Sequence, residues 1–466
     1  MEQPKKNFSF FERYVSGETN SATWGVVSRG IALANTFLIL SALSLYQYGV
    51  YQLLLQSYSF LIVFIGVGAN VVKNDIFRYA GEGNDSFAKK LYIELTAART
   101  VVGVLLWAVT FFGASLFSFR FGADAIALIR ILSFLFLYEI LLRLMQPILL
   151  LRMKFFVLGT RGVLNKSFQF LLLLFFFFFM HLGVREVILS QVVAAFLSLI
   201  FFVPAFIGSY KPWMRVVPAQ QGIMLRILMS YGKWAFFRPM LNKATTFVST
   251  WLIKLLISTE AVAIFSVAQS MVGLVKGFTP TGSLSILIPI SLQDKERAQR
   301  ILSYGTKYLV LLSIVLALGG LAVAPPLIYL FFPQYVPALP LFYLMLPHMV
   351  INAAGAVATI FFFALRKQKF LFLQSVLSSV STIGLYLILI PLFGIWGLAL
   401  EYIITPLFLL GVLYWYIKTI KPGVWIQWSA ILSFGKEDKI FLSNIFAQGK
   451  VILQGRLLRR KKPALE

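Results

Sequence analysis

The stretch YGKWAFFRPMLNKATTFVSTWLIKLL, residues 231–256, is apolar enough to cross a membrane, yet it carries four cations. Lys233 and Lys254 fall near its ends, where a long side chain can reach the interface. Arg238 and Lys243 fall well inside it. A charge at mid-membrane costs at least ~2.5–3.5 kcal/mol on insertion scales, so each needs water or a partner. Cations held in this way are suited to binding phosphate oxygens, and arginine can do so in bidentate fashion.

Twelve basic residues fall within the predicted apolar spans, whereas three acidic residues lie well inside them. Arg143 follows Glu139 by four residues on one helix face and is expected to pair with it. Lys233, Lys254, Lys307 and Arg161 lie close enough to a span end to reach the interface. The cations that we single out have no carboxylate three or four residues away, and they are Arg29, Arg130, Arg238, Lys243 and Lys276. Their excess favours a water-filled, electropositive cavity within the membrane. The alternative is that the segment ends are misplaced and some of these cations lie at the interface.

Ion coupling needs a group that can exchange a proton or bind a cation. The candidates are Glu94, Glu139, Glu401 and His348. His348 shares a helix face with Asn352. The alternative to ion coupling is that His348 is a core histidine with hydrogen-bond partners inside the protein. The side chains suited to meeting hydroxyl groups are Asn35, Gln56, Asn242, Gln269 and Asn352. For each of these, a hydrogen bond between helices is the competing explanation.

Thiol chemistry is excluded by composition, because the chain has no cysteine. Its only histidines are His181 and His348. Zinc sites draw mainly on these two residue types, so the composition disfavours a zinc enzyme, and no metal or cofactor is expected.

The elements that carry these residues are membrane helices. Of 466 residues, 59% are hydrophobic and the mean hydropathy is +0.84. Apolar runs of about 20 residues, each long enough to cross ~30 Å of hydrocarbon, recur along the chain. The chain is therefore predicted to be an all-α polytopic membrane protein. The twelve predicted spans are 22–45, 48–72, 91–118, 123–151, 155–180, 186–208, 231–256, 260–291, 304–331, 337–364, 370–391 and 394–417.

The loops between these spans alternate in charge. The N-terminus, the even-numbered loops and the tail carry 28 basic residues, whereas the odd-numbered loops carry only Arg120 and Arg185. Positive residues concentrate on the cytoplasmic side, so both termini are predicted to be cytoplasmic. The same rule accounts for most of the net charge of +25, so nucleic acid is not expected as a partner. Residues 1–21 are too polar for a cleavable signal peptide.

An internal repeat divides the chain. A shift of 214 residues places LYQYGVYQLLLQSYSFL (45–61) over TEAVAIFSVAQSMVGLV (259–275) and Arg29 over Lys243. Six spans per half give two lobes of the same orientation, with a substrate site expected between them. The predicted organisation is an N-terminal segment at 1–21, an N-lobe at 22–208, a linker at 209–230, a C-lobe at 231–418 and a basic tail at 419–466. Arg29 and Lys243 would face one central cationic cavity.

Residues 43–84, LSLYQYGVYQLLLQSYSFLIVFIGVGANVVKNDIFRYAGEGN, together with 256–278 and SLQDKERAQRIL at 291–302, resemble the oligosaccharide flippases. These form a branch of the multidrug/oligosaccharidyl-lipid/polysaccharide exporter superfamily. The resemblance covers residues 15–420. It implies two six-helix lobes, alternating access, and a substrate such as an undecaprenyl-diphosphate-linked oligosaccharide used for surface polysaccharide synthesis. It also implies that Arg29 and Lys243 contact the diphosphate.

The resemblance further implies the cytoplasmic membrane as location and lipid and lipid-linked oligosaccharide as partners. Glycosyltransferases or the polymerase of the same pathway are further candidate partners. The drug-exporting members of the superfamily often have acidic residues early in the first span, and this chain has none there. A drug or cation antiporter remains the main alternative. A membrane glycosyltransferase or polymerase is disfavoured because the odd-numbered loops are a few residues long and hold no carboxylate pair, so no enzyme activity is expected.

Overall fold

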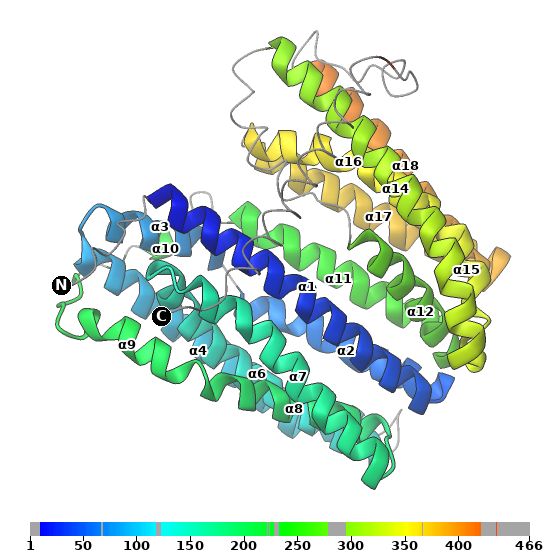
Figure 1. Ribbon diagram of the computed structural model, residues 1–466, viewed down its shortest axis with the longest axis horizontal. Helices are drawn as coiled ribbons and strands as arrows, with labels where there is room; N and C mark the ends of the chain where they lie inside the picture. Colours follow the sequence, from blue (N-terminus) through cyan, green and yellow to red (C-terminus); the bar gives the residue numbers. More distant parts are fainter. Residues whose placement is uncertain are drawn as a thin grey trace, which may run out of the picture.

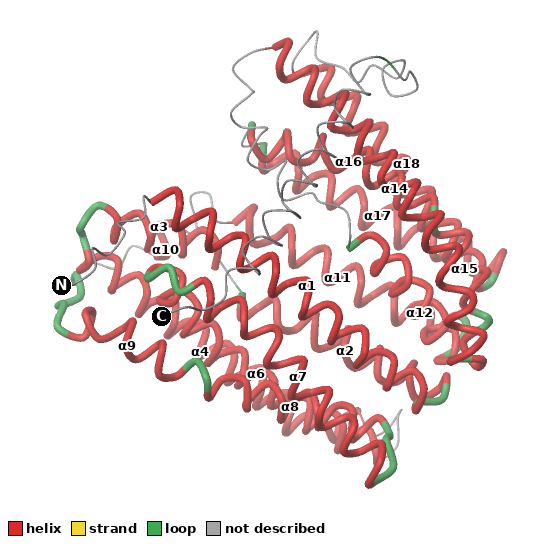
Figure 2. The backbone as a smooth tube through the Cα atoms, viewed as in Figure 1, coloured by secondary structure: helices red, strands yellow, loops and turns green. Residues whose placement is uncertain are grey.

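The computed structural model describes residues 10–66, 69–117, 123–220, 222, 224–227, 233–277, 295–365, 367–420 and 435. These residues form helices joined by short turns, and no strand occurs among them (Figures 1 and 2). The α-helices are α1 (Phe10–Ala42), α2 (Leu45–Ile65), α3 (Ala69–Gly81), α4 (Asp85–Gly113), α6 (Ala123–Leu151), α7 (Phe155–Phe179), α8 (Val184–Ile200), α9 (Val203–Met214), α10 (Met224–Ile227), α11 (Lys233–Leu256), α12 (Thr259–Lys276), α14 (Lys295–Phe331), α15 (Ala338–Met345), α16 (Pro347–Ala364), α17 (Gln368–Phe393) and α18 (Ile395–Ile420). Two 3-10 turns, η1 (Ala114–Phe117) and η3 (Pro333–Tyr335), complete the set.

The helices account for the predicted spans where the structure describes them, and residues 278–291 of the eighth predicted span lie outside the described residues. Over the described ranges, ten helices are long and apolar enough to cross a membrane, and α8 with α9, bent by 48°, makes an eleventh candidate. The 24-residue helix α11 has the length of a further span but carries the cations noted above. The prediction of a polytopic helical membrane protein with about twelve spans is confirmed. The second span is shorter than predicted, because α2 ends at Ile65 and Gly66 follows.

The two halves pair their helices in the same order. In the N-terminal half, α1 packs on α7, α4 on α6, α6 on α8, and α7 on α8. In the C-terminal half, α11 packs on α17, α14 on α16, α16 on α18, and α17 on α18. These correspond pair by pair, with α1 matching α11 and α2 matching α12. Two lobes of like architecture follow, as the sequence repeat predicts.

The lobes share a hydrophobic core at one end and have separate cores at the other. The shared cluster includes Leu43 and Tyr48 of the first half and Phe265 and Tyr335 of the second. Away from it, the N-lobe buries a cluster around Ile76 and Trp213, and the C-lobe buries another around Phe361, Leu371 and Ile417. We call the first the joined end and the second the separated end. Figure 1 shows α14, α16 and α18 diverging from the N-lobe toward the separated end.

Helix α2 forms the contact between the lobes, packed against both α11 and α12. Gly49 makes the approach to α12 possible, because a Cβ atom there would collide with the backbone carbonyl of Thr259. Phe60 of α2 stacks on Phe247 of α11 with ring centroids 5.1 Å apart. A glycine and a stacked ring pair therefore place α2 between the two halves.

The segment between the lobes is held against the N-lobe. Lys89 Nζ donates to the carbonyl of Val216 at 2.7 Å, and Ser86 Oγ donates to that of Val217 at 2.7 Å. Helix α9 continues to Met214, inside the range predicted for the linker. The predicted tail lies outside the described residues beyond Ile420, apart from Gly435.

Candidate functional site

A cavity of about 850 Å³ lies within the C-lobe, bounded by α11, α12, α14, α16, α17 and α18. Its volume is within the range of pockets that enclose small molecules. The lining is unusual for a membrane helix bundle because much of it is amide and hydroxyl. The amides are Asn242, Gln269, Asn352 and Gln374, and the hydroxyls include Thr245, Thr246, Ser249, Thr250, Ser378, Ser379, Thr382 and Thr405.

The polar lining follows helical periodicity. On α11, Asn242, Thr245, Thr246 and Ser249 recur at intervals of three and four residues and so share one face. The two threonine hydroxyls also bond to the helix's own backbone: Thr245 Oγ1 donates to the carbonyl of Leu241 at 2.8 Å, and Thr246 Oγ1 donates to that of Asn242 at 3.0 Å. On α17, Gln374, Ser378 and Thr382 form a matching stripe. Two polar helix faces therefore meet the same cavity.

Glu401 is the carboxylate that lines the cavity. Its residue is 4% exposed, and the hydroxyl of Thr382 on α17 donates to its Oε1 at 2.6 Å. Tyr386, another lining residue, is 2% exposed. No lysine or arginine lies within 4 Å of this carboxylate in the described part of the chain. A buried carboxylate that accepts a hydrogen bond from a neutral hydroxyl is suited to holding a proton or a cation.

His348 lines the same cavity, but both of its ring nitrogens already have hydrogen-bond partners. Its Nδ1 lies 2.8 Å from the carbonyl of Tyr402, and its ring packs on the Tyr402 ring with centroids 4.0 Å apart. The Asn352 amide contacts its Nε2. These partners are consistent with a neutral imidazole that carries its proton on Nδ1, because the carbonyl can only accept and the amide nitrogen can only donate.

Two of the predicted cations lie near the end of α12. Lys276 is the lysine that lines the cavity, and within the described ranges no arginine lines it. Arg29 of α1 donates from Nη1 to the carbonyl of Gly277 at 2.6 Å, one residue beyond Lys276 and in the other lobe. The Arg29 side chain is exposed, as is Lys276. An N-lobe guanidinium thus reaches the edge of the C-lobe site.

The other three predicted cations do not line the cavity. Arg238 of α11 donates to the hydroxyl of Ser375 on α17 at 3.3 Å. Lys243 is exposed on α11, beside the lining residue Asn242. Arg130 lies in the N-lobe, with its Nε 3.4 Å from the carbonyl of Phe111 and its guanidinium over the Phe111 ring. The sequence prediction gathers all five around one central cavity. Among the described residues, Lys276 is the one of the five that lines the C-lobe cavity, and Arg29 bonds to the residue after it.

The remaining two acids lie in the N-lobe and have other partners. Glu139 pairs with Arg143 at 2.9 Å, as the spacing of four residues predicts. Glu94 lies 3.7 Å from Lys90 and accepts the backbone N–H of Met224 at 3.2 Å, which ties the segment between the lobes to α4. Of the four residues predicted for ion coupling, Glu401 and His348 share the cavity with Lys276.

The sequence prediction names three of the amide residues that line the cavity, Asn242, Gln269 and Asn352. It does not name the serine and threonine residues of the lining. The sequence of α11 contains a pattern that could have predicted this lining, because four polar residues recur on one face of an apolar span. A stripe of this kind must face protein or water, because lipid offers no hydrogen bonds. Asn35, also predicted to meet hydroxyls, lies elsewhere, with its amide 3.1 Å from the carbonyl of Lys166.

No family model and no curated protein matches the sequence. Solved structures match the fold. One is an inward-facing conformation of a multidrug resistance MATE family transporter of the MOP superfamily, with a TM-score of 0.70, 14% identity and coverage of 84% of this chain and 93% of that chain. Another is the lipid II flippase MurJ in an inward closed conformation, with a TM-score of 0.68, 15% identity and coverage of 92% of this chain and 93% of that chain.

An outward-facing conformation of a MATE family transporter matches with a TM-score of 0.65, 13% identity and coverage of 87% of this chain and 95% of that chain. All three matches span nearly the whole of the solved chains. This protein therefore has the two-lobed helical membrane fold that these transporters share, as the resemblance implies. These neighbours are transporters and a flippase rather than enzymes.

Proposed function

We propose that the protein is a flippase which carries a diphosphate-linked oligosaccharide lipid from the inner to the outer leaflet of the cytoplasmic membrane. The observation that carries the proposal is the C-lobe cavity, which combines many amides and hydroxyls with Lys276 at the edge where Arg29 approaches. Hydroxyls and amides suit a glycan, whereas cations suit a diphosphate. The two-lobed fold supplies the framework for alternating access.

The proposed orientation puts the separated end in the cytoplasm. The basic loops that contain Lys154 and Lys367 lie at that end, since they precede α7 and α17. The chain then faces inward, with its glycan site open to the leaflet where lipid-linked sugars are assembled. Residues 22–208 and 231–418 would act as the two moving lobes, and glycosyltransferases or the polymerase of the pathway would be partners.

The energy for net outward movement has two proposed sources. A negative interior drives an anion outward by ~2.3 kcal/mol per charge per 100 mV. Glu401 would add coupling to a proton or cation, because it is the buried carboxylate of the cavity. Glu94 and Glu139 are weaker candidates, since each is already engaged in the N-lobe.

Export of a cationic drug is the second candidate function. Glu401 favours it, because a buried carboxylate can bind an organic cation. The many amide and hydroxyl side chains in the lining favour the glycan lipid. The two functions predict opposite effects of charge: neutralising Lys276 should impair transport of an anionic substrate and leave or improve transport of a cationic one.

The test is translocation in reconstituted vesicles, using diphosphate-linked oligosaccharide lipids and, separately, a fluorescent organic cation. Lys276→Met and Arg29→Gln should each lower lipid translocation by tenfold or more. Arg130→Gln is the matched control, because Arg130 lies in the N-lobe against Phe111 and should have little effect. Wild-type protein that moves the cation but not the lipid would establish the drug-export function instead.

A further inference from the structure

The joined end contains a contact between the C-terminus of one helix and a loop of the opposite lobe. The last carbonyls of an α-helix have no partner within the helix. At the end of α1, the carbonyl of Leu40 cannot receive the N–H of Ser44, because that N–H donates to Gln47 Oε1 at 3.0 Å. The helix therefore ends with acceptors that must find donors elsewhere.

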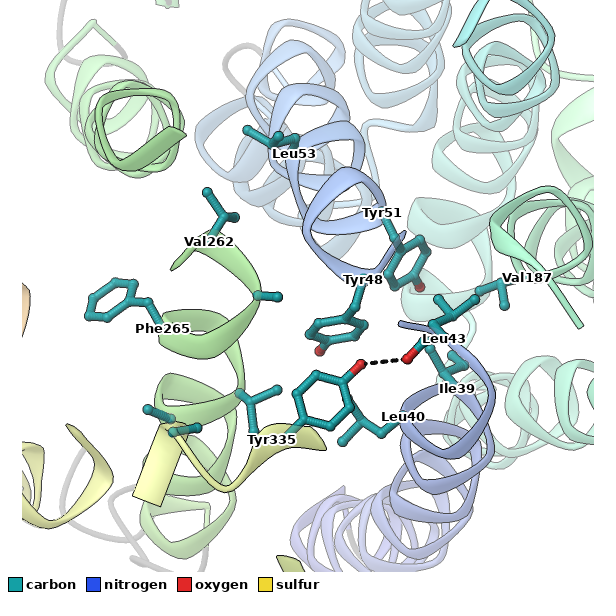
Figure 3. Close-up of a cluster of buried hydrophobic side chains, with 14 of the residues drawn as sticks. Ile39, Leu40, Leu43, Tyr48, Tyr51, Leu53, Val187, Val262, Phe265 and Tyr335 are labelled. Carbon is teal, nitrogen blue, oxygen red and sulfur yellow. Dashed lines mark hydrogen bonds between the residues drawn. The ribbon is translucent and has the colours of Figure 1, made fainter. Parts of the chain in front are cut away.

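Those donors come from η3 in the C-lobe. Gln334 Nε2 lies 3.0 Å from the carbonyl of Leu40 and 3.0 Å from that of Leu43. The Tyr335 hydroxyl donates to the carbonyl of Leu43 at 3.0 Å, the bond drawn in Figure 3. More than 290 residues separate the partners, so these bonds exist only while the two lobes meet.

Aromatic side chains enclose the tyrosine bond. Tyr335 and Leu43 are both fully buried. Tyr48 of α2 lies edge-on to Tyr335 with centroids 5.7 Å apart, and Phe37 of α1 contacts Phe332 at 4.7 Å. A hydrogen bond in such surroundings is costly to leave unmade. The enclosure therefore favours the joined state for as long as water is kept out.

We propose that Gln334 and Tyr335 form a latch which caps α1 and holds the extracytoplasmic side of the transporter shut until the substrate is released outward. The latch rests on the proposed function only for its orientation and its place in the transport cycle. Its donors belong to one lobe and its acceptors to the other, so outward opening must break all three bonds. Water then satisfies the freed groups, which makes the break reversible.

The latch predicts a shift of a conformational equilibrium that can be measured without substrate. The chain has no cysteine, so spin labels can be placed on introduced cysteines without background. Suitable positions are Met180, which is 58% exposed at the end of α7, and Trp396, which is 46% exposed at the start of α18. They lie in different lobes at the joined end, and their separation should increase when that end opens.

Tyr335→Phe keeps the buried ring and removes only the hydroxyl. In purified protein it should raise the ratio of opened to closed populations roughly two- to tenfold, the change expected for one hydrogen bond. Gln334→Met should act in the same direction, and the double variant should exceed either. Tyr414→Phe is the matched control, because the Tyr414 hydroxyl donates to the carbonyl of Ala354 at 2.7 Å within the C-lobe.

An unchanged distance distribution in the double variant overturns the latch. A shift of equal size in Tyr414→Phe also overturns it, because the effect would then not depend on contact between the lobes. The same samples, reconstituted for the lipid assay, separate this proposal from the proposed function. If wild-type protein fails to move the lipid while the labels still report the shift, the substrate assignment is wrong and the latch stands.

Discussion

Thr382 on α17 donates a 2.6 Å hydrogen bond to the buried carboxylate of Glu401 on α18. The pair joins two helices that both line the C-lobe cavity. Its geometry sets the environment of Glu401, the carboxylate found among the described residues that line the cavity. The Thr382 hydroxyl therefore contributes to the stability of the lobe. It also affects how readily the Glu401 carboxylate exchanges a proton or a cation.

Thr382→Val should destabilise the protein by about 1–3 kcal/mol, because it leaves the buried Glu401 carboxylate with one donor fewer. Thr382→Ser keeps the hydroxyl and should cost less. The measurement is unfolding of the purified protein in a denaturing detergent, followed by circular dichroism. If valine and serine variants unfold at the same midpoint, the hydroxyl is not stabilising Glu401.

Glu401→Gln should uncouple transport from an imposed ion gradient, because an amide cannot exchange a proton or neutralise a cation. Glutamine can still accept the Thr382 bond, so the fold should persist. The measurement is lipid translocation in vesicles with and without a pH or sodium gradient. Glu139→Gln serves for comparison, since Glu139 pairs with Arg143 outside the cavity. A gradient response that survives in Glu401→Gln would exclude this carboxylate as the coupling group.

Gly49→Ala should lower stability by about 1–3 kcal/mol through overpacking, because the added Cβ would collide with the Thr259 carbonyl of the other lobe. Gly30→Ala is the control. No atom lies within 4 Å of its added Cβ, so it should be neutral or slightly stabilising in the helix. The melting temperature of each variant in detergent checks the difference. Equal behaviour of the two would mean that α2 does not approach α12 this closely.

Lys89→Met combined with Ser86→Ala should release the segment between the lobes, because their side chains bond to the carbonyls of Val216 and Val217. Trypsin cleavage after the exposed Arg215 should accelerate by roughly tenfold, since bonds from charged donors contribute about 1.5–3 kcal/mol. Lys154→Met, at an exposed lysine elsewhere, controls for the lost charge. Mass spectrometry of the fragments measures the rate, and an unchanged rate would show that the segment is held by other contacts.

Local features were predictable because their causes are local. The pairing of Glu139 with Arg143 follows from their spacing of four residues on one helix. The pairing of helices in the C-lobe follows that of the N-lobe, as the repeat at a shift of 214 residues predicts. The polar face of α11 could also have been predicted, because Asn242, Thr245, Thr246 and Ser249 recur at helical intervals in an apolar span.

The sequence by itself determined that the chain is a bundle of membrane helices, because a backbone in lipid must satisfy its hydrogen bonds within each span and a span needs about 20 apolar residues. It also placed several cations within the predicted apolar spans. Only the tertiary structure decided which of them share a site. Arg29 reaches Gly277 and Tyr335 caps Leu43 across 248 and 292 residues of chain. Such contacts depend on how the two lobes pack and on which end is joined. The periodicity of a single helix predicts neither property.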